Sequence, residues 1–385
     1  MKKEKFGFKI LKLFINALYI LFIFIIVDSL LKLVGFDEWL DLDFSVFISK
    51  FLLFMFIWLI IYVFVYIVSI LIHELGHLLF GLRANLEFVS FNVLNFTITK
   101  ENKKLVIKKV PNINGVSGYC NMAFDDKVKY NSKEVISYFF GGIFFNMIMV
   151  IIFACILPLT KDYLYLICLL VISVNVYLAF YNMIPIVHKN GLRSDMKQVL
   201  LYVNASEFTK IYGKISKIQS YINDGKKLKD IDASLVYMPN VIDNSTNLQM
   251  AFIYIDYLME CNRFDDVIKK VKYVREKAKD IMSFSDENLL KMQLILALYN
   301  KNKLNDIAFE WDNDFNKYIR ATEGSSPIGI AVEYMYYRLI RNENDKCERC
   351  LYKIDKLKKY YGKTREYKEV KEFINEVDDR YEGRK

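Results

Sequence analysis

The sequence is poor in the residues that build disulfide frameworks and structural zinc sites. Six of its 385 residues are cysteines, and their spacing is not that of a disulfide framework, which indicates a reducing compartment for the second half. Cys347 and Cys350 form a C-x-x-C, but there is no second pair to complete a structural zinc site. Histidine is scarcer still, with three residues in the whole chain.

Charge is nearly missing from the first half of the chain. Of residues 1–200, 34 are Lys, Arg, Asp or Glu, against 63 of the 185 residues that follow. This split excludes a single uniform globular domain and a wholly disordered chain, and it predicts two domains, 1–200 and 201–385. The net charge of +9 is mild and dispersed over both halves, so it gives no argument for nucleic acid as a partner.

Four apolar segments in the first half are long enough to cross a bilayer, which takes about 20 residues. They cover about 11–34, 51–72, 135–157 and 163–184. The first follows a lysine-rich start and is similar to a signal peptide, but no A-x-A-like cleavage site follows it, so we interpret it as an uncleaved span. We therefore expect an all-α polytopic membrane protein with four transmembrane helices, followed by a soluble α-helical domain.

The distribution of Lys and Arg predicts the orientation of these spans. Five lysines lie at or before the start of the first span, the loop after it is acidic, and residues 83–133 carry nine Lys/Arg against four Asp/Glu. The positive-inside rule then places both termini and the 83–133 loop on the cytoplasmic side of a multi-pass cell-membrane protein. The high content of Lys, Ile and Asn favours a bacterial source.

The 83–133 loop contains strand-like sequence. Residues 96–99 and 105–107 flank Lys-Glu-Asn-Lys-Lys, which predicts a small β-hairpin insert. Pro111, Gly115 and Gly118 predict irregular backbone after it. The basic loop also suits an anionic inner leaflet of the lipid bilayer.

The second half has helical periodicity and an internal repeat. Similar helix–turn–helix units are centred on 262–264, 302–304 and 342–344, close to 40 residues apart. Such units resemble tetratricopeptide or related repeats and predict an α-helical repeat domain. Its groove would suit a cytoplasmic protein partner or a substrate tail, and attachment there would raise the effective concentration of substrate.

The clearest chemical motif is His73-Glu74-Leu75-Gly76-His77, which lies at the end of the second apolar segment. Four-residue spacing on a helix puts the two imidazoles on one face, where they can bind one Zn²⁺. Glu74 points about 100° away around the helix and can reach a metal-bound water without ligating the metal. Zinc lowers the pKa of that water to about 7, and the carboxylate takes its proton during attack on a peptide carbonyl.

Zinc also needs a third protein ligand on the same side of the membrane. The fourth apolar segment ends at Asn182-Met183-Ile184-Pro185 on that side, and His188, Asn190 and Asp195 follow it. The residues alone leave the choice among these three open.

These motifs resemble the site-2 protease family of intramembrane zinc metalloproteases, over roughly residues 51–200. The resemblance comprises His73-Glu74-x-x-His77, Asn182-x-x-Pro185 and Gly142-x-x-x-Asn146, the last with Ile143 in place of the family's proline. It implies a core of three helices, Zn²⁺ as cofactor, and a substrate- or oxyanion-positioning role for Asn182 and Asn146. Without the resemblance, each asparagine could equally hydrogen-bond a neighbouring helix.

The chain departs from the family pattern at the third ligand. Where the family often has Asp-Gly, this sequence has Asn190-Gly191, and a neutral amide is a poor substitute for a carboxylate on Zn²⁺. We assign the ligand to Asp195, at the start of an expected helix 196–203, although Ser and Asp there also suit a helix N-cap. His188, Asn190 or the lack of any proper third ligand are the alternatives.

Three functions fit the sequence. The first is a membrane zinc endopeptidase acting on a membrane-bound regulator or a peptide precursor, with the 96–107 hairpin pairing with the unwound substrate. The second is a catalytically weak membrane scaffold whose repeat domain binds a partner in an export, immunity or signalling system. The third is a multi-pass anchor, which leaves the His73-Glu74-x-x-His77 motif as a coincidence.

Overall fold

Four long helices form the apolar part of the molecule. The computed structural model describes residues 6–39, 42–101, 104–109, 117–123, 133–187, 193–204, 207–324, 326–362 and 364–383. Within them, four helices are long and apolar enough to cross a membrane, which confirms the four predicted helical segments. They are α1 (Phe6–Leu33), α3 (Phe44–Arg83), α4 (Lys133–Ile156) and α5 (Asp162–Met183), and the short α2 (Phe36–Trp39) joins the first two.

Helix α3 is longer at both ends than the predicted segment 51–72. Its 40 residues span about 60 Å at 1.5 Å per residue, twice the roughly 30 Å of a bilayer's hydrocarbon core. The His73–His77 motif consequently lies in the last third of a continuous helix, with six further residues after it.

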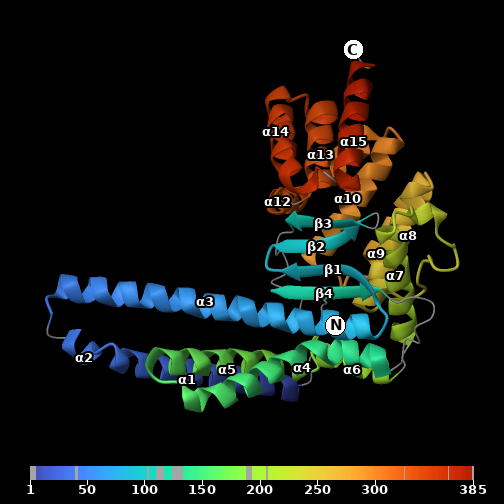
Figure 1. The fold of residues 1–385 in the computed structure, drawn as a ribbon. Helices are drawn as coiled ribbons and strands as arrows, with labels where there is room; N and C mark the ends of the chain where they lie inside the picture. The colour runs from blue at the N-terminus through green and yellow to red at the C-terminus, as the bar shows by residue number, and fades with distance from the viewer. Residues whose placement is uncertain are drawn as a thin grey trace.

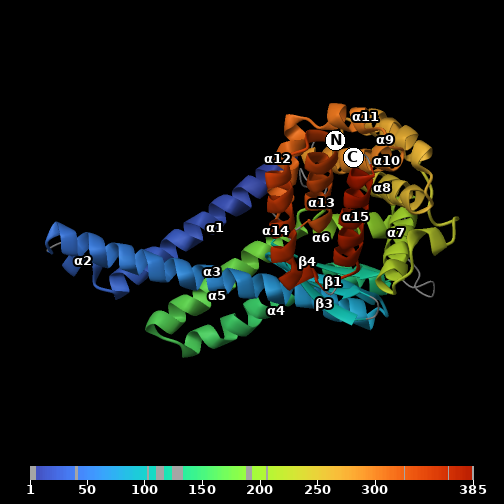
Figure 2. The ribbon, with the colours of Figure 1, turned by 90° about the horizontal axis from the view of Figure 1, so that it is seen from above.

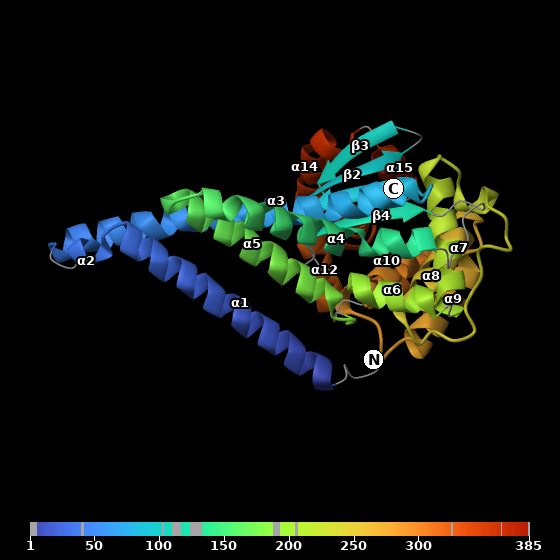
Figure 3. The ribbon, with the colours of Figure 1, turned by 60° about the horizontal axis from the view of Figure 1, so that its bottom comes forward.

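The four helices lie side by side, with α5 between α1 and the α3–α4 pair (Figure 3). Helices α3 and α4 approach most closely at Gly76 and Gly141. A Cβ atom built on Gly76 would lie 2.3 Å from the carbonyl oxygen of Gly141, so only glycine permits this backbone contact. On the other side of the bundle, the rings of Tyr19 and Tyr177 stack with their centroids 4.2 Å apart and tie α1 to α5.

A four-stranded antiparallel sheet follows α3. Its strands are β1 (Glu87–Val93), β2 (Phe96–Glu101), β3 (Lys104–Lys109) and β4 (Gly118–Ala123), in the order β3-β2-β1-β4. Figure 1 shows β4 lying nearest α3 and β3 farthest from it.

The predicted hairpin is confirmed as β2 and β3, with Ile98 opposite Ile107. The expectation of irregular backbone at Gly118 is wrong, because Gly118 pairs with Val93 and begins β4. Pro111 and Gly115 lie outside the described residues. The sequence hid β4 because its side chains, Gly-Tyr-Cys-Asn-Met-Ala, do not follow the polar–apolar alternation by which a strand is recognised.

The second half is helical, as predicted. Its helices are α6 (Asp195–Val203), α7 (Glu207–Asn223), α8 (Ser245–Glu260), α9 (Phe264–Lys277), α10 (Phe284–Asn300), α11 (Leu304–Glu310), α12 (Asn313–Thr322), α13 (Pro327–Tyr336), α14 (Asn344–Tyr361) and α15 (Arg365–Glu382). Short 3₁₀ turns lie at Leu157–Leu159 and Leu228–Asp230, and a π-helical turn, Tyr337–Arg341, extends α13. The buried side chains of α8 to α15 form one continuous apolar core.

The three predicted repeat turns share one backbone geometry. Asn262, Asn302 and Asn342 all have left-handed backbones, with φ of 57°, 56° and 54°. In the first two turns the next N–H donates back to a carbonyl five residues earlier, as in a Schellman motif. Each asparagine therefore ends one helix and allows the next to start within three residues, which confirms the three turns. The resemblance to tetratricopeptide repeats stays a prediction.

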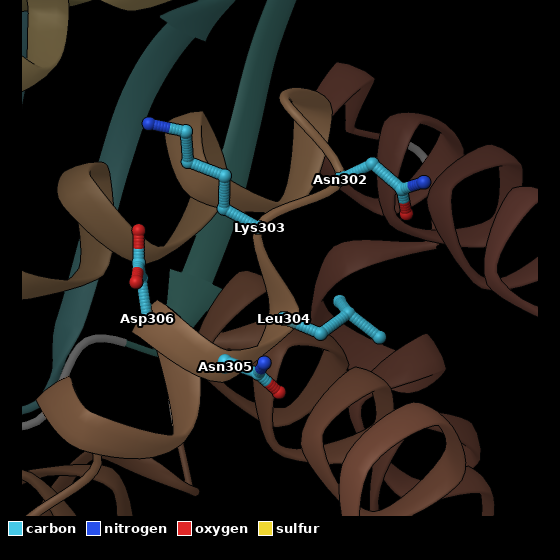
Figure 4. Close-up of a pocket in the computed structure, with 5 residues that line it drawn as sticks. All are labelled: Asn302, Lys303, Leu304, Asn305 and Asp306. Carbon is cyan, nitrogen blue, oxygen red and sulfur yellow. The ribbon is translucent and has the colours of Figure 1, made fainter.

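The turn at Asn302 also borders a shallow surface hollow. Lys303 and Asp306 extend to one side of it and Asn302 to the other (Figure 4). These three side chains are exposed to solvent, and the hollow is far along the chain from the His73–His77 motif. It belongs to the repeat turn rather than to the candidate metal centre.

Helices α12 to α15 lie beyond β3, on the side of the sheet away from the long apolar helices (Figure 1), and α7 lies at one side of the strands (Figure 2). At the outer edge of the sheet, the Tyr361 hydroxyl of α14 donates to the carbonyl oxygen of Lys109, at 2.7 Å. Helix α7 packs on β1 and β4. Its Ser220 hydroxyl donates a hydrogen bond to the Glu87 carboxylate, and its Ser216 hydroxyl donates to the Met122 carbonyl oxygen. Helices α6 and α7 thus link the two predicted domains, whose division at residue 200 stays a prediction.

Candidate metal centre

Two histidines on α3 form the base of the site. His73 and His77 lie one helical turn apart, are 7% and 6% exposed, and their Nε2 atoms are 3.3 Å apart. Their other ring nitrogens are both held by α4. His77 Nδ1 lies 2.8 Å from the carbonyl oxygen of Tyr138, and His73 Nδ1 lies 3.1 Å from the Asn146 amide nitrogen. Both Nε2 atoms are thereby directed to the same point.

Asp195 reaches the same point from α6. Its Oδ2 atom lies 3.1 Å from His73 Nε2, and its Oδ1 atom lies 3.4 Å from His77 Nε2. Within the described residues, donor atoms of His73, His77 and Asp195 all lie within 4.8 Å of one another. The structure therefore brings together the three residues that the sequence analysis proposed as ligands.

Ser194 explains how Asp195 comes to this position. It is the N-cap of α6, and its hydroxyl donates to the carbonyl oxygen of Ile184 at 2.6 Å and accepts from the N–H of Ile186 at 3.1 Å. A β-bridge between Val187 and Arg193 adds a second tie. The start of α6 is consequently fixed to the end of α5, and Asp195 is the first helical residue rather than the cap.

The geometry of the three donors fits a zinc ion. Zinc bonds of about 2.0–2.2 Å in a tetrahedron require ligand atoms roughly 3.3–3.6 Å apart, close to the 3.1–3.4 Å between these donors. Gly142 of α4 leaves the space that an ion needs, because a Cβ atom there would lie 2.5 Å from both Nε2 atoms. Two imidazoles and one carboxylate are also a common donor set of catalytic zinc, with one position left for water.

The electrostatics of Asp195 suit a metal ligand. Burial alone would raise the pKa of its carboxyl, but His77 and His73 outweigh that effect and lower the pKa below its usual value. The group is consequently an anion at neutral pH, as a metal ligand has to be.

Glu74 lies beside the three donors but is not one of them. The residue is 6% exposed, and the backbone N–H of Cys120 in β4 lies near its carboxylate. Gly118 is in contact with it, since a Cβ atom on Gly118 would lie 3.0 Å from Glu74 Oε1. The Tyr138 hydroxyl donates to the Cys120 carbonyl, at 2.7 Å, so β4 is held between α4 and the glutamate.

The other predicted site residues lie in different surroundings. Asn146 is fully buried and contacts His73. The Asn182 amide donates to the carbonyl of Leu178, one turn earlier in α5, at 3.1 Å, so its role in positioning substrate stays a prediction. His188 and Asn190, the alternative third ligands, lie outside the described residues.

Sequence reasoning missed the parts of the site that support the ligands. The Tyr138 carbonyl and the Cys120 N–H are backbone groups and leave no trace in residue identity. The contacts of Gly142 and Gly118 need the packing of α4 and β4 to be known. Ser194 carried a usable signal, because Ser before a helical segment is a favoured N-cap.

Comparison with known families agrees with this geometry over part of the chain. Residues 61–163 match the family model described as peptidase family M50, whose members are zinc metalloproteases. No curated protein and no solved structure matched the chain. The matched segment contains the His73-Glu74-x-x-His77 motif and all of α4, and it ends before Asn182 and Asp195. The match indicates a membrane-embedded metalloprotease. The matched segment does not reach Asp195, the third donor, or the helices of the second half.

Proposed function

We propose that this protein is a membrane-embedded zinc endopeptidase that hydrolyses peptide bonds in or near the membrane. The observation that carries the proposal is the meeting of His73, His77 and Asp195, from two separate helices, at distances that suit one zinc ion. Glu74 beside them supplies the base that peptide hydrolysis needs. The match to peptidase family M50 over residues 61–163 supports the same reaction class.

His73, His77 and Asp195 would hold the ion. When bound, zinc polarises the scissile carbonyl and lowers the pKa of a water molecule to about 7. The Glu74 carboxylate takes the proton of the attacking water and passes it to the nitrogen of the leaving amine. The contact with Gly118 of β4 restricts the orientation of that carboxylate. Its burial excludes bulk water from the proton transfer.

The depth of the site supports cleavage close to one membrane surface. His73 is 29 residues after Phe44, the start of α3, a rise of about 44 Å. This exceeds the roughly 30 Å of the hydrocarbon core, so His73 lies near the end of α3 that carries the sheet. We propose that this end faces the cytoplasm, as the excess of Lys and Arg in residues 83–133 indicates.

We propose a membrane-bound regulator or a peptide precursor as the substrate class, with the helices of the second half as the docking site for a cytoplasmic partner. The position of the 96–107 hairpin argues against its pairing with substrate at Glu74. Strand β2 is paired along both edges, and β3 is the strand farthest from α3 and meets Tyr361 of α14. Strand β4 is the one that contacts the catalytic motif.

The test uses the full-length chain in cells and after purification in detergent. New protein N-termini in or near membrane segments are identified by mass spectrometry in cells producing the wild type, Glu74→Gln or Asp195→Asn. Zinc is measured on each purified protein. We expect Glu74→Gln to keep zinc and lose the new termini, and Asp195→Asn to lose both. If Glu74→Gln produced the same termini as the wild type, the protease assignment would be wrong and the membrane scaffold would replace it.

A further inference from the structure

The two histidines are held by chemically different partners on α4. His77 Nδ1 faces the carbonyl oxygen of Tyr138, which can only accept a hydrogen bond. A proton of His77 is therefore fixed on Nδ1, which leaves Nε2 as the atom that can ligate a metal ion. His73 Nδ1 instead faces the side-chain amide of Asn146, which offers both a donor nitrogen and an acceptor oxygen.

This difference allows His73 to exist in two tautomers. With its proton on Nε2, His73 faces Asp195 Oδ2, and its Nδ1 accepts from the Asn146 nitrogen at 3.1 Å, as in the structure. When Nε2 ligates a metal ion, the proton has to move to Nδ1, which then needs an acceptor. The Asn146 nitrogen, itself a donor, would then face a second donor.

We propose that Asn146 is a positioning residue whose amide turns over when the metal binds, so that its oxygen accepts from His73 Nδ1–H. This inference rests on the proposed function and assigns Asn146 to the zinc ligand instead of to the substrate. A half-turn of the amide exchanges its oxygen and nitrogen with almost no change in shape.

The burial of Asn146 gives this turn its energetic importance. The side chain is 0% exposed, and among the described residues its Oδ1 atom has no hydrogen-bond partner. A buried polar atom without a partner is costly. Turning the amide pairs Oδ1 with His73 Nδ1–H and moves the amide nitrogen to the place where Oδ1 has no partner. The number of unpaired buried atoms is unchanged, and the ring gains the acceptor that orients it for the metal ion.

The test compares Asn146→Leu, which has no acceptor, with Asn146→Asp, which has only acceptors. Asn175→Leu is the matched control, because Asn175 is another fully buried amide of the helix bundle and bonds Ser69 instead of a histidine. Zinc affinity is measured on full-length protein in detergent by competition with a chromogenic chelator. The absorption spectrum of the Co²⁺-loaded protein reports the ligand geometry, and melting temperatures without metal report folding.

We expect Asn146→Leu to weaken zinc binding about 10- to 100-fold, as loss of a ligand-orienting partner typically does. We expect Asn146→Asp to bind zinc at least as tightly as the wild type, and Asn175→Leu to match the wild type. Wild-type zinc affinity in Asn146→Leu, or an equal loss in Asn146→Leu and Asn146→Asp, would overturn the inference while leaving the protease proposal intact. A wild-type protein that binds no zinc would overturn both.

Discussion

Replacing Gly142 with alanine should remove the metal and leave the fold in place. The added Cβ would lie 2.5 Å from the Nε2 atoms of both His73 and His77. Zinc itself binds such nitrogens at about 2.0–2.1 Å. The methyl group would therefore occupy nearly the same space as the ion, between the two rings.

The size of the effect follows from these distances. An ordinary carbon–nitrogen contact is 3.4 Å or longer, so each ring has to retreat by close to 1 Å to accommodate the methyl group. An ion cannot then stay within bonding distance of both rings. We expect the zinc affinity to fall by at least about 100-fold, equivalent to about 2.7 kcal/mol of binding free energy. The atoms that clash are side-chain atoms, so the helix backbones need not move.

The assay is zinc titration of the purified full-length protein, together with thermal unfolding in the presence of a chelator. Gly7→Ala is the control, because a Cβ atom on Gly7 of α1 meets nothing within 4 Å. Gly7→Ala should bind zinc as the wild type does. If Gly142→Ala also bound zinc with wild-type affinity, the ion could not lie between His73 and His77, and the proposed centre would be refuted.

Other changes test neighbouring parts of the structure. Gly118→Ala should lower cleavage activity about tenfold with zinc retained, since displacement of a catalytic group by a fraction of an ångström is costly; loss of zinc would contradict this. Ser194→Ala should cost about 1 kcal/mol of stability, measured by unfolding, and should weaken zinc binding by loosening Asp195. Free zinc at about 100 times its Kd should stabilise the wild type by about 2.7 kcal/mol, and Asp195→Asn should show little of this gain in melting experiments. Asn302→Ala should destabilise the protein by about 1 kcal/mol because of its left-handed backbone, whereas Asn302→Gly should not.

The helices could be predicted because their signals are local. Runs of apolar residues longer than a bilayer requires identify α1, α3, α4 and α5 without any knowledge of packing. The asparagines of the repeat turns, such as Asn262, are equally local, because Asn tolerates the left-handed backbone that ends a helix. For the same reason His73 and His77 could be paired at once, since a helix fixes the geometry of residues four apart.

The supporting contacts could not be predicted because they join distant parts of the chain. Strand β4 approaches Glu74 from more than 40 residues away, through a backbone N–H that any residue other than proline provides. The resemblance assigns Asn146 to substrate, whereas in the structure its side chain contacts His73. Asp195 could be proposed as a ligand, but the hydrogen bonds of Ser194 that bring it to the site depend on the path of the chain between α5 and α6.

The arrangement of α4 explains why the motif on α3 is not sufficient to form the site. Tyr138, Gly142 and Asn146 are four residues apart and so form one stripe along α4. Because α4 runs antiparallel to α3, the first of them meets His77, the last meets His73, and Gly142 lies between the two rings. The first and last orient the imidazoles, and the middle one leaves room for the ion. The two histidines thus form a candidate metal centre only together with α4, which places a carbonyl acceptor, a glycine and an amide opposite their rings.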